Sequence, residues 1–262
     1  GAFDAMSSGQ NFRRLHLGHN QISQLDGECD AVFAGIAQSL TSLHLDHNFL
    51  GQLQQQQQQN SSSDSSGSSM FGCLVNLNEL LLTGNYLREL APYAFSQLGQ
   101  LKYLYLDNNQ ISVIRRDAFA GLDSSLELLD LSGNKIEQVR WHFFARLRQL
   151  TELTLSLNRI MQIEPGAFEH LGQLVYLRLQ HNYLDDESVE AGDCFRLNKT
   201  KSASKQKLQL NMSHNELTRL NAGHLSSSGS NLSSLQLEHF VLNHNRVQLV
   251  EAGAFTDCSA LQ

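Results

Sequence analysis

The chain has 262 residues, 41% of them hydrophobic, and a formal net charge of −7 at pH 7. The charge is spread without long acidic or basic blocks, which argues against a general nucleic-acid binder. No apolar run approaches the roughly 20 residues that a membrane-spanning helix needs, and GAFDAMSSGQ at the start lacks the features of a signal peptide.

One frame, L-x-x-L-x-L-x-x-N-x-L-x-x-L, recurs nine times along the chain. LKYLYLDNNQISVI at 101–114 and LTELTLSLNRIMQI at 150–163 are clear copies. The commonest interval between successive frame asparagines is 24 residues, which sets the length of one repeat. The frame asparagines are Asn20, Asn48, Asn85, Asn109, Asn134, Asn158, Asn182, Asn215 and Asn245.

Each copy begins with the alternating leucines of a short strand, such as Leu104 and Leu106 in the fourth copy. A strand this short cannot bury its apolar side alone, so the copies are expected to stack into a parallel sheet. The asparagine amide offers both donors and an acceptor, so we predict that it satisfies backbone groups of its own and neighbouring coils. The nine asparagines would then form a structural ladder.

A second marker lies ten residues past the asparagine, where five copies carry phenylalanine, usually after alanine. We expect each coil to run through a strand, an asparagine turn and an arc that buries this phenylalanine. The markers are Phe95, Phe119, Phe144, Phe168 and Phe255.

The phrase LDLSGNKI at 129–136 and the A-F-x-x-L segments resemble the leucine-rich repeat family, in its 24-residue extracellular subtype. Toll-like receptor ectodomains and the adhesion protein chaoptin use this subtype, and the resemblance covers residues 1–262. It implies an α/β leucine-rich repeat solenoid (a horseshoe) with a parallel concave β-sheet and an irregular or short-helical convex side. It also implies that the concave sheet binds other macromolecules, without indicating which.

The phase of the frame predicts a single array over residues 1–262, with nine full repeats and partial repeats at both ends. We expect a fragment of a longer ectodomain, because the chain opens with a marker GAF and ends just past Leu261, where the next strand should begin. The Gln/Ser-rich residues 54–70 are predicted to be a disordered insertion within repeat two, since Leu77 restarts the frame in phase.

Four N-x-[ST] sequons favour a glycoprotein on the secretory route, and one of their asparagines should face the concave surface. They begin at Asn60, Asn198, Asn211 and Asn231, of which Asn211 is the concave one. Cys29 and Cys73 lie in loops of adjacent repeats and are the pair we single out as a disulfide, with unpaired thiols as the alternative. Cys194 and Cys258 are two repeats apart, which is too far for a disulfide unless a loop moves.

No motif for catalysis is present: the chain lacks CxxC, HExxH, GxSxG and a phosphate-binding loop. Four histidines in two neighbouring repeats would suit Zn²⁺ or a pH switch, but histidine recurs at the same turn position elsewhere, as expected for an exposed polar turn. We therefore predict no catalytic residue, no metal and no cofactor. The four are His16, His19, His44 and His47, and the recurrences are His181, His214 and His244.

The frame fixes which strand side chains point outward, and several of them are aromatic, apolar or charged. Tyrosine and arginine often dominate protein interfaces, whereas strand packing is the alternative reason for aromatics on a sheet. We predict the partner site at Leu81, Tyr103, Tyr105, Leu128, Asp130, Glu152, Tyr176 and Arg178.

These features predict a protein-binding ectodomain of a receptor or adhesion protein, extracellular or at the cell surface. The expected partner is a protein ligand or cell-surface protein, homophilic contact included, with no nucleic acid and with a membrane only through an anchor outside the fragment. An intracellular scaffold or inhibitor is the alternative, which the repeat subtype and the sequons disfavour. A hydrolase or metalloenzyme is a third class, disfavoured because no nucleophile lies beside a base.

Overall fold

The computed structural model describes residues 12–25, 28–53, 70–190, 194–195, 197, 207–221 and 237–255. The chain divides into two compact units, Gly1–Glu127 and Leu128–Gln262, which we call unit 1 and unit 2. Each unit is built from successive coils of the predicted repeat.

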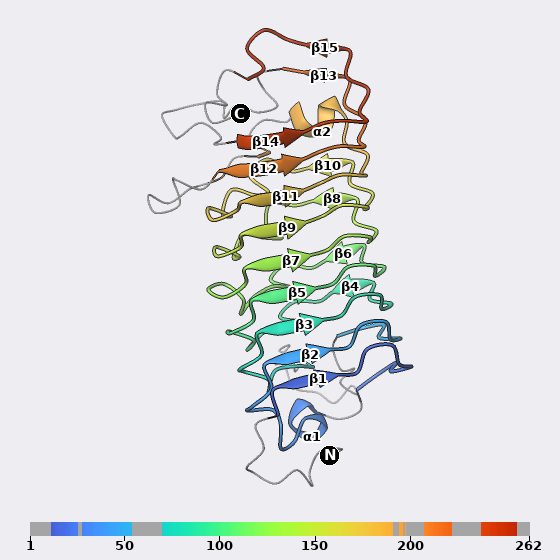
Figure 1. Ribbon diagram of the computed structural model, residues 1–262, viewed down its shortest axis with the longest axis vertical. Helices are drawn as coiled ribbons and strands as arrows, with labels where there is room; N and C mark the ends of the chain where they lie inside the picture. Colours follow the sequence, from blue (N-terminus) through green and yellow to red (C-terminus); the bar gives the residue numbers. More distant parts are fainter. Residues whose placement is uncertain are drawn as a thin grey trace, which may run out of the picture. The chain divides into compact units, whose positions relative to one another are not determined.

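Unit 1 is a stack of coils with one strand of a parallel sheet in each (Figure 1, blue to green). The sheet order is β1, β2, β3, β5, and the partners lie in register, so that Arg14, Ser42, Glu79 and Tyr103 form one outward row. The elements are β1 (Arg14–His16), α1 (Cys29–Val32), β2 (Ser42–His44), β3 (Glu79–Leu81), β4 (Glu89–Leu90), β5 (Tyr103–Tyr105) and β6 (Val113–Ile114).

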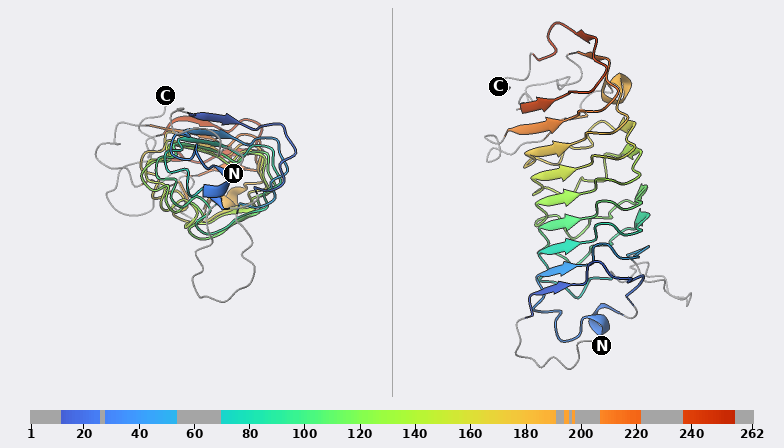
Figure 2. Two further views of the ribbon diagram at one scale, coloured as in Figure 1. Left: turned by 90° about the horizontal axis from the view of Figure 1, so that it is seen from below. Right: turned by 45° about the vertical axis from the view of Figure 1, so that its right-hand side comes forward.

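Unit 2 repeats this arrangement with five parallel strands in the order β7, β9, β11, β12, β14 (Figure 2, light green to red). The register shifts once, between Leu208 and Gln209, so that Gln209 pairs with His239. The elements are β7 (Leu128–Asp130), β8 (Gln138–Val139), β9 (Glu152–Thr154), β10 (Gln162–Ile163), β11 (Tyr176–Arg178), α2 (Asp186–Glu190), β12 (Leu208–Asn211), β13 (Arg219–Leu220), β14 (Leu237–Val241) and β15 (Leu249–Val250).

The return half of the coils contains short strands that the frame did not predict. β4 pairs with β6, β8 with β10, and β13 with β15, each over two residues in parallel. Each begins one residue before the last apolar position of the frame, as in Glu89–Leu90. The described residues contain two helices, α1 and α2, both in coils that carry extra residues, so the convex side is mostly turns, as expected.

The core is filled by the frame leucines and by the phenylalanine markers. Phe95 stacks on Phe119 at 6.0 Å between ring centroids, and Phe144 stacks on Phe168 at 6.3 Å, all four buried. Phe255 does not follow this pattern, because no described coil packs on its outer side and it stays 40% exposed.

The asparagines hold neighbouring coils together through their side-chain amides. Asn109 donates to the carbonyls of Leu82 in the preceding coil (2.9 Å) and Leu106 in its own (3.0 Å), and it accepts from the Leu87 N–H (3.1 Å). Asn48, Asn85, Asn158, Asn182, Asn215 and Asn245 bridge their coils in the same way. Asn134 is buried and donates to Leu131 of its own coil, whereas Asn20 is exposed and its amide donates within its own coil, to Leu17 and Gly18.

Candidate functional site

The outward face of the unit 1 sheet carries three of the residues predicted to bind a partner. Glu79 pairs with Tyr103 and Leu81 with Tyr105, so the two tyrosines and the leucine share one patch of β3 and β5. Tyr103 is 37% exposed, and Leu81 and Tyr105 are half-buried. We call Leu81, Tyr103 and Tyr105 the unit 1 patch.

The unit 2 sheet holds the other five predicted residues, of which three interact directly. The Arg178 guanidinium lies 5.3 Å from the centre of the Tyr176 ring and forms an ion pair with Glu152 on the neighbouring strand. Arg178 also approaches the Thr154 hydroxyl, at 3.5 Å. We call Glu152, Tyr176 and Arg178 the unit 2 patch.

Leu128 and Asp130 lie on β7, next to the unit 2 patch in strand order. Leu128 pairs with Glu152 across the sheet and is half-buried. Asp130 accepts the Ser132 N–H at 2.8 Å, which shapes the turn after β7. Asp130 therefore has a structural contact of its own, besides any contact with a partner.

Ser42, His44 and Glu79 form a polar cluster on β2 and β3 whose residue types resemble a catalytic triad. Ser42 Oγ lies 2.8 Å from Glu79 Oε2 and 3.1 Å from His44 Nε2, and Glu79 lies 3.3 Å from that same nitrogen. A triad needs the base and the carboxylate at opposite nitrogens of the imidazole, and a hydroxyl held by the base alone. This cluster does not meet either condition, and Ser42 is buried.

The pKa of Glu79 reflects the same cluster. Burial raises the pKa of this carboxyl. The hydrogen bonds from Ser42 and His44, together with the charges of His44 and Arg14, lower it by more, so the pKa of Glu79 lies below its ordinary value. The carboxylate form is thus stabilised by its neighbours, as in a structural polar cluster.

The recurrent histidines before the frame asparagines share a left-handed backbone. In unit 1, His19 and His47 have φ of 55° and 51°, and in unit 2, His181, His214 and His244 have φ of 57°, 54° and 59°. Asparagine, aspartate and histidine tolerate this region better than most residues, which explains why histidine recurs there. The four histidines singled out in the sequence separate into two pairs, His16 with His44 on the sheet and His19 with His47 in the turns.

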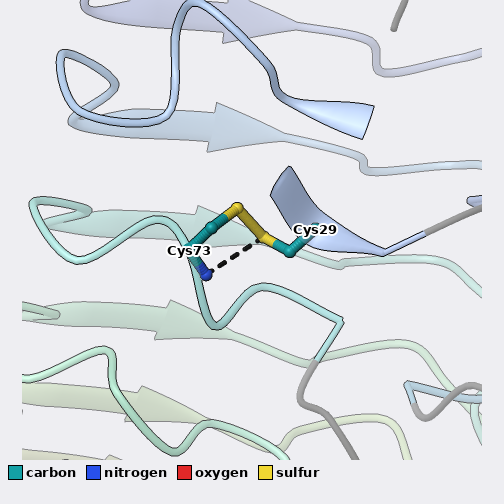
Figure 3. The surroundings of a disulfide bond; sticks show 2 residues. All are labelled: Cys29 and Cys73. Carbon is teal, nitrogen blue, oxygen red and sulfur yellow. Dashed lines mark hydrogen bonds between the residues drawn. A yellow bond between two sulfur atoms is a disulfide. The ribbon is translucent and has the colours of Figure 1, made fainter. Parts of the chain in front are cut away.

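Cys29 and Cys73 are joined by a disulfide bond, with their Cα atoms 5.6 Å apart (Figure 3). Cys29 belongs to α1 in the first coil, and Cys73 follows the second coil's insertion. The Cys73 N–H also points at the Cys29 sulfur, at 3.1 Å. The bond therefore ties the arcs of the first two coils together.

Cys194 is buried, with its thiol 3.5 Å from the Ile163 carbonyl. Cys258 lies outside the described residues.

Of the sequon asparagines, Asn211 is at the end of β12 on the outward face, as expected from the frame. Its side-chain oxygen accepts from the N–H and the hydroxyl of Ser213, the sequon serine, at 3.0 and 2.8 Å. Asn60, Asn198 and Asn231 lie outside the described residues, as do residues 54–69 of the predicted insertion, whereas Met70 at its end is buried.

Sequence reasoning missed an aromatic pair beside the sheet. Phe49 and Tyr86, each directly after a frame asparagine, are exposed and stack at 5.6 Å between ring centroids. Tyr183 is exposed at the same frame position in unit 2. Large aromatics one residue past the asparagine in successive copies were the signal that would have identified this pair.

The coils, the asparagine ladder and the sheet face define a leucine-rich repeat solenoid. A family model described as "Leucine rich repeat" matches residues 75–136 and 124–184. The chain is 32% identical to lumican of Oryctolagus cuniculus over 212 residues, covering 80% of each chain. The chain belongs to the leucine-rich repeat family.

Other relatives are longer than the matched region. Human lumican is 29% identical over 88% of this chain and 52% of its own length, and human podocan-like protein 1 is 28% identical over 95% of this chain and 42% of its own. The chain thus spans about half the length of these two relatives.

Two solved structures have the same fold. A chain in the octameric complex of latrophilin 3, Unc5D and FLRT2 (LRR) matches with a TM-score of 0.68 and 20% identity, over 95% of this chain and 73% of that one. A chain in the TLR13–ssRNA13 complex matches with a TM-score of 0.58 and 21% identity, over 90% of this chain and 37% of that one. At these identities the likeness concerns the fold.

The protein is extracellular or at the cell surface, in line with its relatives. Its disulfide bond agrees with this, because such bonds form and persist in oxidising compartments. Among the described residues, no helix combines the length and apolar character needed to cross a membrane.

Proposed function

We propose that the chain is the protein-binding part of a receptor or adhesion protein, and that its nine frames form one continuous array. The partner would be a protein held on the outward face of the sheets, where the unit 1 and unit 2 patches lie. Binding rather than catalysis is favoured because Ser42, His44 and Glu79 are arranged as a structural cluster.

The unit 2 patch carries this proposal. Tyr176 and Arg178 belong to the residue types most often found at the energetic centre of protein interfaces. The ion pair with Glu152 and the ring of Tyr176 hold the arginine in place, so little side-chain entropy would be lost on binding. Tyr176 and the Arg178 side chain are each 36% exposed, so this tyrosine–arginine pair is held in place and still open to a partner.

The unit 1 patch supports the proposal from a second position. Tyr103 is exposed, and its half-buried neighbours Leu81 and Tyr105 form a mainly apolar surface around it. Such a mixture of an exposed tyrosine with apolar surroundings is typical of interface cores.

The titles of the two structural neighbours name different partner classes. The FLRT2 complex contains other proteins, and the TLR13 complex contains RNA. A protein partner is favoured for this chain, because its net charge of −7 would repel the phosphates of a nucleic acid.

The test is a binding screen of the secreted chain against a panel of purified extracellular protein domains, followed by titration of each hit. Tyr176→Ala combined with Arg178→Ala is expected to weaken binding by at least about tenfold, as for interface residues worth more than about 1.4 kcal/mol. Tyr103→Ala with Tyr105→Ala is expected to abolish binding while secretion stays unchanged.

Tyr183→Ala is the control, since this tyrosine is 52% exposed, more than Tyr176 at 36%, but lies beside the sheet. It should bind as the parent chain does. Unchanged affinity in both sheet-face variants, or a loss in Tyr183→Ala alone, would overturn the sheet-face assignment.

A further inference from the structure

The turns after β1 and β2 bring two imidazoles and one carboxylate together in unit 1. His19 and His47 stack with their ring centroids 4.4 Å apart, and Asp46 Oδ2 lies 3.6 Å from His19 Nε2. One ligand atom from each of the three residues lies within 4.8 Å of the others. We call His19, Asp46 and His47 the turn cluster, and we propose that it is a binding site for Zn²⁺.

The backbone fixes the two turns against each other. The His19 N–H donates to the Asp46 carbonyl at 2.8 Å, and the His47 N–H donates to the Thr83 carbonyl at 2.7 Å. With φ of 55° and 51°, both histidines leave their turns in the same left-handed conformation, so their side chains are directed alike. The cluster is therefore set by the hydrogen-bonded backbone of three successive coils.

Two glycines make room for the ligand side chains. A Cβ on Gly18 would lie 2.5 Å from the Asp46 carboxylate, and a Cβ on Gly84 would lie 2.5 Å from His47 Nδ1. Any other residue at either position would displace a member of the turn cluster. The carboxylate of Asp46 is thus packed against the first turn, where its side chain is only 19% exposed.

The chemistry of this donor set suits zinc. Two neutral imidazoles and one carboxylate, with water in the fourth position, is a set that Zn²⁺ takes in proteins, at about 2.0–2.2 Å from each ligand atom. Tetrahedral coordination at that radius needs ligand atoms about 3.3 Å apart. The nearly parallel rings must therefore rotate to converge on an ion, and the His19 side chain, which is 76% exposed, is placed to do so.

The left-handed backbone explains why histidine occupies these turns, but it does not explain the carboxylate. In unit 2, His181, His214 and His244 stack in the same turns at 4.0 and 4.2 Å, and the residues before them are Gln180, Ser213 and Asn243. The unit 2 histidines thus share the geometry of the turn cluster without its acidic ligand. They provide a control for metal binding within the same chain.

The consequence of zinc binding would be a second tie between the first two coils. The ligands come from the turns after β1 and β2, whereas the Cys29–Cys73 disulfide joins the arcs of the same coils. An ion that binds the folded chain and not the unfolded one raises the free energy of unfolding in proportion to the logarithm of its concentration above Kd.

The test is titration of the secreted, disulfide-intact chain with ZnCl2 in competition with a chromophoric chelator, together with thermal unfolding with and without ZnCl2. We expect one Zn²⁺ per chain and a higher Tm with zinc. Asp46→Asn and His19→Asn are expected to weaken binding by at least about tenfold, because losing even a hydrogen-bond partner of a metal ligand typically costs about that much affinity. Asparagine has nearly the same size as aspartate, and although it is smaller than histidine, it tolerates the left-handed turn at position 19.

His214→Asn in unit 2 is the matched control and should bind zinc as the parent chain does. Circular dichroism of each variant separates lost binding from lost folding. The proposal is wrong if the parent chain takes up no zinc, if both unit 1 variants bind as tightly as the parent, or if His214→Asn alone removes binding.

Discussion

Histidine occupies the left-handed turn position in both units, and its surroundings differ between them. In unit 1, His19 and His47 lie beside the carboxylate of Asp46. In unit 2, His214 lies between His181 and His244, with uncharged residues before all three. The same left-handed backbone therefore holds histidines beside a carboxylate in unit 1 and among uncharged residues in unit 2. The residue before the histidine, Asp46 in one case and Ser213 in the other, makes this difference.

The end coils of the two units also differ. The first coil of unit 1 is joined to the second by the Cys29–Cys73 disulfide. The coil of β15 in unit 2 exposes Val250, 54% accessible, at a frame position where inner coils bury Leu90, Val139 and Ile163. A coil with a described neighbour on one side only has fewer described packing partners than an inner coil, so a covalent tie contributes most there.

The largest expected effect comes from breaking that tie. Cys29→Ala with Cys73→Ala removes a cross-link between residues that are 44 positions apart in the sequence. The unfolded chain then gains conformational entropy, so the free energy of unfolding of the first coils should fall by about 4 kcal/mol. Hydrogen exchange of the amides in β1 and β2 would measure the loss. The amides of β9 and β11 in unit 2 are the internal reference and should keep their protection. Equal loss of protection in both units would contradict a tie that acts locally.

The asparagine ladder should act alike in both units. Asn109→Ala in unit 1 and Asn158→Ala in unit 2 each remove donors to two coils and an acceptor for a buried N–H. Each unpaired buried group costs about 1–3 kcal/mol, so either variant should lose about 3 kcal/mol or more in thermal or urea unfolding.

Asn20→Ala is the control for the ladder. Asn20 is exposed and its amide bonds to Leu17 and Gly18 of its own coil, so water can replace the lost bonds and the cost should stay below about 1 kcal/mol. A loss at Asn20 as large as that at Asn109 would show that bridging between coils is not what makes the ladder stabilising.

The repeat could be predicted from the sequence because one frame fixes both the strand and its outward positions. Leu104 and Leu106 are buried and Tyr103 and Tyr105 lie outward, as the alternation requires. Because the frame recurs nine times, equivalent positions of neighbouring copies can be aligned from their spacing. The structure pairs these positions, so the outward rows within each unit followed from the sequence.

The rest depended on contacts between side chains that spacing does not encode. The frame placed Glu152 and Arg178 on the sheet, but it could not show that they pair with each other. Likewise it placed His19 and His47 in one column, whereas the approach of Asp46 depends on the missing side chain of Gly18. The two-residue strands such as Glu89–Leu90 are too short to leave a periodic signal.

The smallest expected effect sharpens the contrast between the histidine columns. Partial burial lowers the pKa of His214, and the neighbouring imidazoles of His181 and His244 lower it further. The unfolded chain therefore binds a proton at higher pH than the folded chain does, so the free energy of unfolding falls as the pH drops below the ordinary histidine pKa of about 6.5.

His214→Asn keeps a residue that tolerates the left-handed turn and should lose less stability than the parent chain between pH 7.5 and 5. Urea unfolding at both pH values would measure the difference, with His170→Asn, an exposed histidine outside the column, as control. A parent chain and a His214→Asn variant with identical pH profiles would show that the stacked imidazoles do not compete for protons.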